Sequence, residues 1–151
     1  MFRLFYIARR SVTLYGTVND IFRALPPNKN YEDKYVLGVY RSDNDLAGIV
    51  DIVRDFPTDG EWIIGLMLLK ADERCNGLGA MVHKALIEWA INLGAKTFRL
   101  GVMQDNYKAI SFWSRLGYKK IKEVDMEFTA KSHVIDVMRL HLCSGFDFAG
   151  K

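Results

Sequence analysis

Apolar residues follow two different spacings along this chain, and the spacing predicts which segments are strands and which are helices. Residues 35–40 and 46–54 are rich in β-branched and aromatic residues, as strands are, and the Ser-Asp-Asn-Asp segment between them has a turn composition. They are expected to form an antiparallel hairpin. Residues 61–70 are almost continuously apolar, which predicts a central strand of a sheet.

A helical spacing of apolar residues begins after Gly77 and ends at Gly94, which has the position expected of a helix C-terminal glycine. The predicted apolar stripe consists of Leu78, Met81, Val82, Ala85, Leu86, Trp89, Ala90 and Leu93. Residues 97–103 return to a strand pattern. A strand, a helix and a strand of these lengths predict a right-handed crossover, so strands 61–70 and 97–103 should be parallel.

Four further elements complete the prediction. Asn106 is expected to cap a second long helix that ends at Gly117, and residues 118–128 and 134–142 are expected to be strands. A short helix over residues 17–25 should stop at two prolines. The predicted fold class is α+β, with a mixed sheet built from an antiparallel meander and one parallel βαβ crossover, and with helices on both faces.

Composition narrows the class of protein. Half of the 151 residues are hydrophobic and 26% are charged, which is typical of a single globular domain. No apolar run approaches the roughly 20 residues that span a bilayer, so no membrane partner is expected. The net charge of +3 is spread along the chain and does not indicate a nucleic-acid partner.

The cysteines and the start of the chain bear on localisation. Cys75 and Cys143 lie far apart and form no CxxC pair, so we expect no metal site, no disulfide framework and a cytoplasmic location. The first ten residues are basic, but Arg3 interrupts their apolar run. A folded segment is therefore favoured over a targeting segment.

Residues 74–79 form a corner between a buried strand and a helix. Free backbone N–H groups and the positive end of the helix dipole meet there, and Gly77 and Gly79 lack side chains that would block a ligand. The corner should bind an anion, and a diphosphate fits best. The P-loop and Rossmann patterns both fail here. We expect a bulky residue at either glycine to abolish binding without disturbing the fold, unless the glycines serve only a tight turn.

Two motifs carry a resemblance to a known family, the GNAT N-acetyltransferases. The first, [Q/R]-x-x-G-x-[G/A] after a central strand, is matched at Arg74, Gly77 and Gly79. The second, N-x-x-A-x-x-F-Y-x-x-x-G-[F/Y], is matched with one departure, because a tryptophan stands in the tyrosine position. Its matching residues are Asn106, Ala109, Phe112, Trp113, Gly117 and Tyr118. The resemblance covers about residues 35–142.

The resemblance implies a cofactor, acetyl-CoA, and a set of residues that would hold it. In this family, backbone groups at the end of the central strand pair with the pantetheine arm, and the amides of the following loop hold the pyrophosphate. The second motif would flank the far side of the cofactor. The residues implied are Met67, Leu68, Leu69, Arg74, Cys75, Asn76, Gly77, Leu78, Gly79, Ala80, Asn106, Ala109, Phe112 and Trp113.

The implied activity is acetyl transfer from acetyl-CoA to a primary amine of a small molecule or peptide. The alternative is a non-catalytic acyl-CoA-binding module, since only one helix is predicted before residue 26, where the family has a strand and two helices. We expect one GNAT-like domain over residues 1–151. It would comprise a shortened N-terminal helical region (1–34), a cofactor-binding core (35–142) and a tail (143–151). A homodimer is left open.

Candidate catalytic groups follow from the chemistry of the reaction, which requires a deprotonated amine. The first candidate base is Glu61, followed by Asp51, and the alternative for both is an ordinary solvated carboxylate. Trp113 cannot supply the proton that the family's tyrosine gives, so Tyr118 and Tyr107 are the candidate substitutes. Packing is the alternative role of Tyr118.

Two further expectations concern single side chains. His83 falls outside the apolar stripe of its helix and is expected to be solvated, and no histidine is assigned a catalytic role. Cys75 is expected to react with alkylating agents faster than Cys143 and to be protected by coenzyme A.

Overall fold

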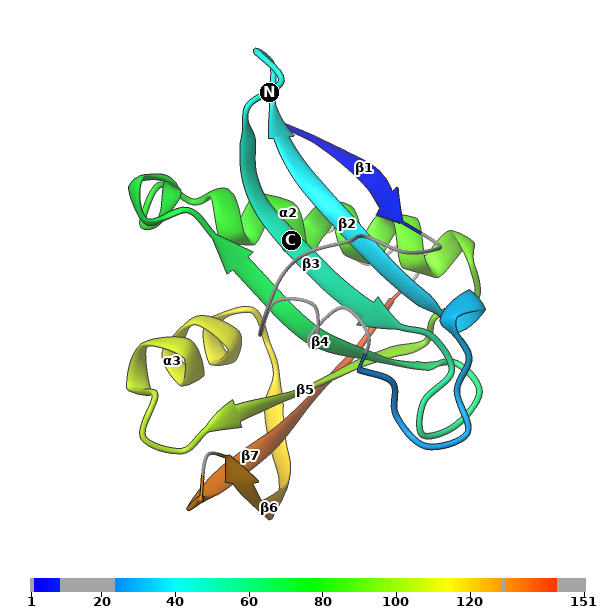
Figure 1. The fold of residues 1–151 in the computed structure, drawn as a ribbon, viewed down its shortest axis with the longest axis vertical. Coiled ribbons are helices and arrows are strands. Elements are labelled where there is room, and N and C mark those ends of the chain that lie inside the picture. Colours follow the sequence, from blue (N-terminus) through cyan, green and yellow to red (C-terminus); the bar gives the residue numbers. More distant parts are fainter. Residues whose placement is uncertain (1, 9–23, 129, 144–151) are drawn as a thin grey trace.

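The computed structural model describes residues 2–8, 24–128 and 130–143. In chain order, its elements are β1 (Phe2–Ala8), η1 (Tyr31–Asp33), β2 (Lys34–Arg41), β3 (Leu46–Val53), β4 (Glu61–Leu69), η2 (Ala71–Glu73), α2 (Leu78–Asn92), β5 (Thr97–Met103), α3 (Tyr107–Arg115), β6 (Lys119–Phe128) and β7 (Lys131–His141). The strands form one sheet in the order β1-β2-β3-β4-β5-β7-β6 (Figure 1).

The predicted mixed sheet and its crossover are confirmed. β4 and β5 are parallel and are joined through α2, whereas the other neighbouring strands are antiparallel. The hairpin of β2 and β3 closes with Arg41 N–H donating to the carbonyl oxygen of Asp45 over 2.9 Å. Most predicted bounds lie within one or two residues of the observed ones, and the α+β class is as expected.

The first strand was not predicted. β1 pairs antiparallel with β2, from Phe2 opposite Arg41 to Ala8 opposite Val36, so the N-terminal region contributes a strand to the sheet. The helix predicted over residues 17–25 lies almost wholly outside the described residues. No helix in the described part of the chain is long and apolar enough to span a membrane.

The core lies between the sheet and the two described helices, which share one face of it. The helices touch each other through His83 of α2 and Trp113 of α3, whose ring centroids are 5.9 Å apart. Trp62 and Phe98 are fully buried on neighbouring strands of this face, and burial of a large apolar side chain contributes about 1.5–3 kcal/mol. The expectation of helices on both faces is not met by α2 and α3.

The buried side of α2 is rotated relative to the predicted stripe. Met81 and Leu93, both predicted to be in the core, are 55% and 49% exposed. His83, predicted to be solvated, is 3% exposed, so that prediction is wrong. The buried residues of the helix are Leu78, Val82, His83, Leu86 and Ala90.

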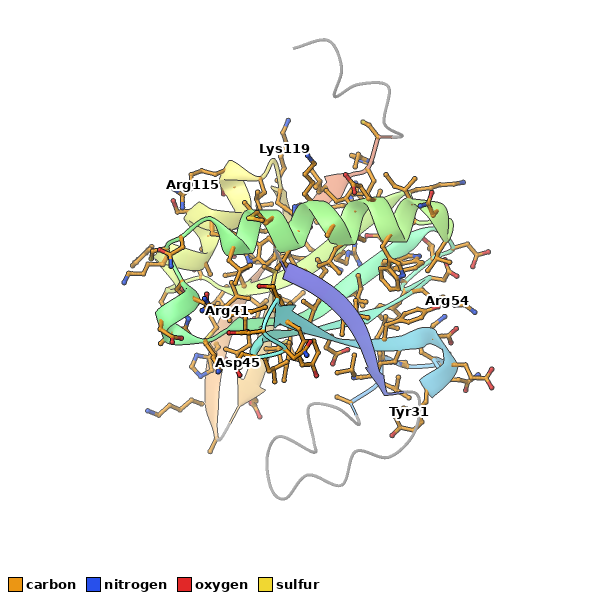
Figure 2. The ribbon with its side chains drawn as sticks, turned by 90° about the horizontal axis from the view of Figure 1, so that it is seen from above. Tyr31, Arg41, Asp45, Arg54, Arg115 and Lys119 are labelled. Atoms are coloured by element: carbon orange, nitrogen blue, oxygen red, sulfur yellow. The ribbon has the colours of Figure 1, made fainter. Side chains whose placement is uncertain are left out.

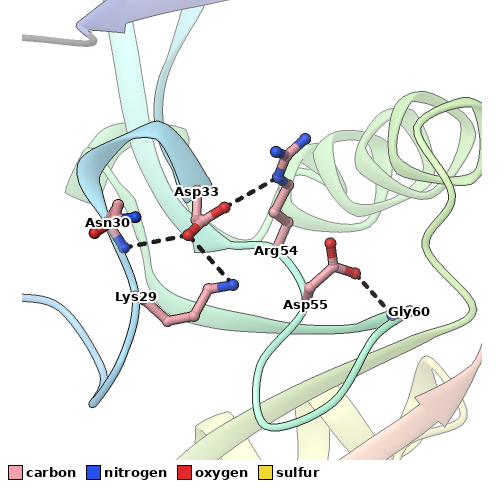
Figure 3. Close-up of polar contacts among 6 residues, drawn as sticks. All are labelled: Lys29, Asn30, Asp33, Arg54, Asp55 and Gly60. Atoms are coloured by element: carbon pink, nitrogen blue, oxygen red, sulfur yellow. Dashed lines mark hydrogen bonds and ion pairs between the residues drawn. The ribbon is translucent and has the colours of Figure 1, made fainter.

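Polar contacts close the end of the sheet where β4 begins (Figure 3). Asp33 of η1 contacts Lys29 and Arg54, each over 3.3 Å. The carboxylate of Asp55 accepts a hydrogen bond from the N–H of Gly60 over 2.7 Å, which holds the turn between β3 and β4. Arg54 lies at one end of the sheet and Arg41 toward the other in Figure 2, so this network is remote from the end of β4.

Candidate functional site

The parallel strands β4 and β5 pair only over their first residues, from Glu61 with Thr97 to Ile64 with Leu100. Beyond that point β4 remains paired with β3, but no described strand pairs with its other edge. The arrowheads of β4 and β5 point apart in Figure 1. We call residues 65–69 of β4 and 101–103 of β5 the β4–β5 split. An unpaired strand edge presents N–H and C=O groups that can bind an extended ligand.

Gly65, the first residue of the split, is a β-bulge in β4. β3 pairs with the residues on either side of Gly65 and leaves Gly65 itself without a partner. This extra residue shifts the alternation of β4, so Met67 and Leu69 pack against the helix-covered core while Leu68 is 50% exposed. All three residues predicted to pair with a cofactor arm therefore lie in the split.

The loop from β4 to α2 turns through two residues of positive φ, Cys75 at 64° and Gly77 at 78°. Gly77 is the N-cap of α2. In the described chain, the amides of residues 75–77 make no backbone hydrogen bond, and the amides of residues 78–80 occupy the first helical turn, where no intrahelical acceptor exists. These N–H groups lie at the positive end of the helix dipole, an arrangement that binds phosphate.

Two side-chain contacts hold this loop in place. The buried carboxylate of Glu73 accepts a hydrogen bond from the guanidinium of Arg41 on β2, and this contact raises the pKa of Arg41. Arg74 donates from Nε to the carbonyl oxygen of Leu69 over 2.9 Å. The loop is thus tied to β2 at its start and to the last residue of β4. These two contacts fix the position of the free amides beside the end of the split.

The two glycines of the loop have different roles. A Cβ at Gly77 would meet no atom within 4 Å, but one at Gly79 would lie 2.9 Å from Cζ of Phe112 and 3.6 Å from Cε of Met67. The expectation that a bulky residue at either position would leave the fold undisturbed is therefore wrong, because Phe112 would have to move at Gly79 and the φ of 78° would strain any side-chain-bearing residue at Gly77. Gly79 lets α3 approach the start of α2.

α3 brings the second motif to the other side of the loop. The side chain of Asn106 caps the helix, accepting a hydrogen bond from the N–H of Ala109 over 3.2 Å. Asn106 is exposed and Phe112 is half-buried against the loop. Trp113 is 9% exposed and packs in the core, so it does not extend toward solvent as Asn106 does.

A buried polar pair lies between the two helices. Nε2 of His83 is 2.8 Å from the hydroxyl of Tyr118, and the rings of Phe98 and Trp113 lie beside the imidazole. Burial lowers the pKa of His83 to about 4 and raises the pKa of Tyr118 far above its ordinary value. At neutral pH the pair therefore consists of a neutral imidazole and a protonated phenol. Tyr107, the other candidate acid, is 78% exposed.

Glu61, the first candidate base, is not brought to the split. It begins β4, is 9% exposed, and its Oε1 lies 2.8 Å from Nε of Arg99 on β5. Gly65 lies four positions further along the chain, which corresponds to roughly 13 Å along a strand. The carboxylate of Glu61 forms an ion pair with Arg99, at the opposite end of β4 from the free amides of residues 75–80, which we call the amide loop.

Asp51, the second candidate base, lies beside the bulge. Its Oδ2 is 3.8 Å from the position that a Cβ of Gly65 would take, and it receives Nζ of Lys34 over 2.7 Å. Lys34 had no role in the sequence interpretation. The register of the predicted hairpin could have identified the contact, since opposite charges on adjacent strands commonly pair.

Sequence comparison finds known proteins that resemble this chain. A sequence model of the acetyltransferase (GNAT) family matches residues 6–118. YobR of Bacillus subtilis, described as an uncharacterised N-acetyltransferase, is 29% identical over 103 residues, which cover 68% of this chain and 38% of YobR. The chain thus spans about two fifths of the length of that relative.

Solved structures share the fold. A mutant form of the spermidine/spermine N-acetyltransferase SpeG from Vibrio cholerae superposes with a TM-score of 0.74 at 10% identity, covering 99% of each chain. Nourseothricin acetyltransferase superposes with a TM-score of 0.63 at 21% identity, covering 74% of this chain and 66% of that one. At these identities the likeness concerns the fold alone.

Proposed function

The chain belongs to the acetyltransferase (GNAT) family, and from this membership we propose that it transfers an acetyl group from acetyl-CoA to a primary amine of a small molecule or peptide. The observation that carries the proposal is the coincidence of two features at one place. A loop of unpaired amides at a helix N-terminus adjoins an unpaired strand edge in the β4–β5 split.

The residues present fit coenzyme A. The amides of residues 75–80 would hold its pyrophosphate, and the edge of β4 at Met67, Leu68 and Leu69 would pair with its pantetheine arm. Asn106, Ala109 and Phe112 would close the side that α3 forms. Leu78 is buried in the core and would contribute its backbone alone.

When bound, acetyl-CoA supplies an activated acyl thioester. The protein would position it by backbone contacts, and positioning of this kind accounts for a large share of rate enhancement in bimolecular reactions. We assign no proton transfer to Tyr118, because its hydroxyl is buried against His83. A thiol with a pKa near 8.5 can depart without a strong acid.

The direct test measures thiol release. Purified protein is given acetyl-CoA and pooled primary amines, and free thiol is compared with a sample that lacks amine. Spermidine and spermine belong in the first pool, because the Vibrio cholerae protein of similar fold has been solved with coenzyme A and spermine. We expect amine-dependent thiol release.

Calorimetry with coenzyme A, together with the thiol assay, distinguishes the proposed enzyme from the alternative, a non-catalytic binding module. A non-catalytic binding module would bind coenzyme A without releasing thiol in the presence of any amine. Absence of both binding and turnover would contradict the proposed function and the alternative together. Gly77→Arg fills the open space at the amide loop with a bulky side chain and is expected to weaken binding strongly.

A further inference from the structure

A buried carboxylate adjoins the β4–β5 split on the face of the sheet away from α2. Asp51 is 4% exposed, and its neighbour in space, Gly65, is exposed to solvent. The side chains of Val50 and Ile52, on either side of Asp51, point into the helix-covered core, so the carboxylate points to the opposite face. The amide loop and Asp51 therefore approach the split from opposite faces.

One oxygen of the Asp51 carboxylate has an ion-pair partner, and the other has no hydrogen-bond partner among the described residues. Oδ2 of Asp51 receives Nζ of Lys34 over 2.7 Å, and the same ammonium donates to the carbonyl oxygen of Ala24 over 2.7 Å. Oδ1 is buried and has no hydrogen-bond partner within the described residues. A buried carboxylate oxygen without a partner is costly to maintain, and a chemical role is one of the explanations for such a group.

The absence of a side chain at residue 65 leaves the Asp51 carboxylate within reach of the split, with Oδ2 as the carboxylate oxygen nearer to that residue. The distance of 3.8 Å between Oδ2 and the position of a Cβ means that any side chain there would contact the carboxylate. Burial raises the pKa of Asp51 against the opposing effect of Lys34, which makes the carboxylate a stronger proton acceptor than a solvated one.

We propose that Asp51 is the group that takes the proton from the acceptor amine, and that Lys34 positions its carboxylate beside the bulge at Gly65. This inference rests on the proposed function, because an amine must lose a proton before its nitrogen can attack the thioester of acetyl-CoA. The amine would enter from the face of the sheet opposite to α2, while the cofactor phosphates would lie at the α2 N-terminus.

The proton transfer balances without a further reactant. An ammonium group R–NH₃⁺ gives one proton to the carboxylate of Asp51, directly or through one water molecule, and becomes R–NH₂ with a free electron pair. The carboxylate becomes a neutral carboxyl group. It returns the proton to solvent past the exposed Gly65 after the product has left.

The test compares pH profiles of kcat/KM for four proteins. Asp51→Asn should reduce kcat/KM about 100-fold at neutral pH, the lower end of the usual contribution of a general base. Its affinity for coenzyme A by calorimetry should be unchanged. Lys34→Gln should shift the ascending limb of the profile to higher pH, because the carboxylate loses the cation that opposes its protonation. Glu123→Gln, which breaks a carboxylate–cation contact with Lys120 on β6, the strand at the far edge of the sheet, should leave the profile unchanged.

A second readout does not depend on activity. The side-chain carboxyl ¹³C resonance of Asp51 should titrate above the ordinary range of aspartate in the wild type, and higher still in Lys34→Gln. If Asp51→Asn does not fold, the double variant Lys34→Gln/Asp51→Asn, which carries no unpaired buried charge, replaces it and should lose the same activity.

The outcomes separate the two proposals. Full activity of Asp51→Asn in a turnover-competent protein would overturn the role of Asp51 and leave the proposed function standing. An unshifted limb and an unshifted resonance in Lys34→Gln would overturn the role of Lys34. No turnover by the wild type with any amine would overturn the proposed function and this inference with it.

Discussion

The stability of this fold should depend on pH through His83. Its imidazole is 3% exposed, and burial lowers its pKa from an ordinary 6.5 to about 4. Because the folded-state pKa lies below the unfolded one, the unfolded chain binds a proton first as the pH falls. The stabilisation is therefore complete above pH 6.5 and is lost progressively toward pH 4.

The size of the effect follows from these two pKa values. At pH 5 a histidine of pKa 6.5 is almost fully protonated in the unfolded chain, whereas a histidine of pKa 4 is mostly neutral in the folded one. The difference lowers the free energy of unfolding by about 2 kcal/mol between pH 7 and pH 5. For a domain of this size, that corresponds to a fall in Tm of about 4–8 °C.

His83→Gln isolates this contribution. Glutamine can still hydrogen-bond to the hydroxyl of Tyr118 but does not titrate. Urea unfolding followed by circular dichroism at pH 7 and pH 5 should show that the wild type loses about 2 kcal/mol more than His83→Gln. His141→Gln, at the exposed end of β7, serves as the matched control and should behave as the wild type does.

Asp51 titrates with the opposite sign, since burial raises its pKa, but its contribution is present in all three proteins and cancels in the comparison. An identical loss of stability in the wild type and in His83→Gln would refute the reasoning. It would mean that the imidazole is protonated in the folded state.

Three further predictions concern the loop and the core. Gly77→Ala should cost about 1–2 kcal/mol of stability, because the φ of this residue is 78°. Gly79→Ala should change the position of α3, because its Cβ would press on Phe112, and the change should be detectable as shifted amide resonances of that helix. Coenzyme A should protect Cys75 from alkylation and leave the labelling of Cys143 unchanged, as measured by mass spectrometry; equal protection of both would count against binding at the loop. Trp113→Phe should lower stability by about 1–2 kcal/mol, below the 3–5 kcal/mol of full truncation, and keep most of kcat; a loss of several hundredfold would indicate a chemical role for the indole.

The sequence was sufficient for the elements whose pattern is local. Strand 97–103 is observed at its predicted bounds, and the helix predicted to begin after Gly77 begins at Leu78, because alternation and glycine positions reveal both. The loop of free amides followed from the same local signals. β1 was missed because Arg3 interrupts a run of seven residues that is too short to show a period.

Features that depend on distant partners could not be predicted in the same way. His83 is buried because Tyr118, 35 residues away, offers its hydroxyl to it. A polar residue next to an apolar stripe is otherwise indistinguishable from a solvated one. Predicting the pairing of Lys34 with Asp51 likewise requires the register of a hairpin. The sequence could not show that Glu61 is an unsuitable base, because its ion pair with Arg99 depends on how β4 and β5 align.

The bulge at Gly65 also bears on how this chain can vary. Deleting that one residue would leave the rest of β4 on its present faces and in its present register with β3, because β3 already pairs across it. The bend that a bulge introduces would disappear, and β4 could then continue alongside β5. We therefore expect the presence of this one residue to decide whether the sheet opens here or closes. Relatives that lack it could retain the core and lose the opening, so the presence of this residue is a simple criterion for sorting them.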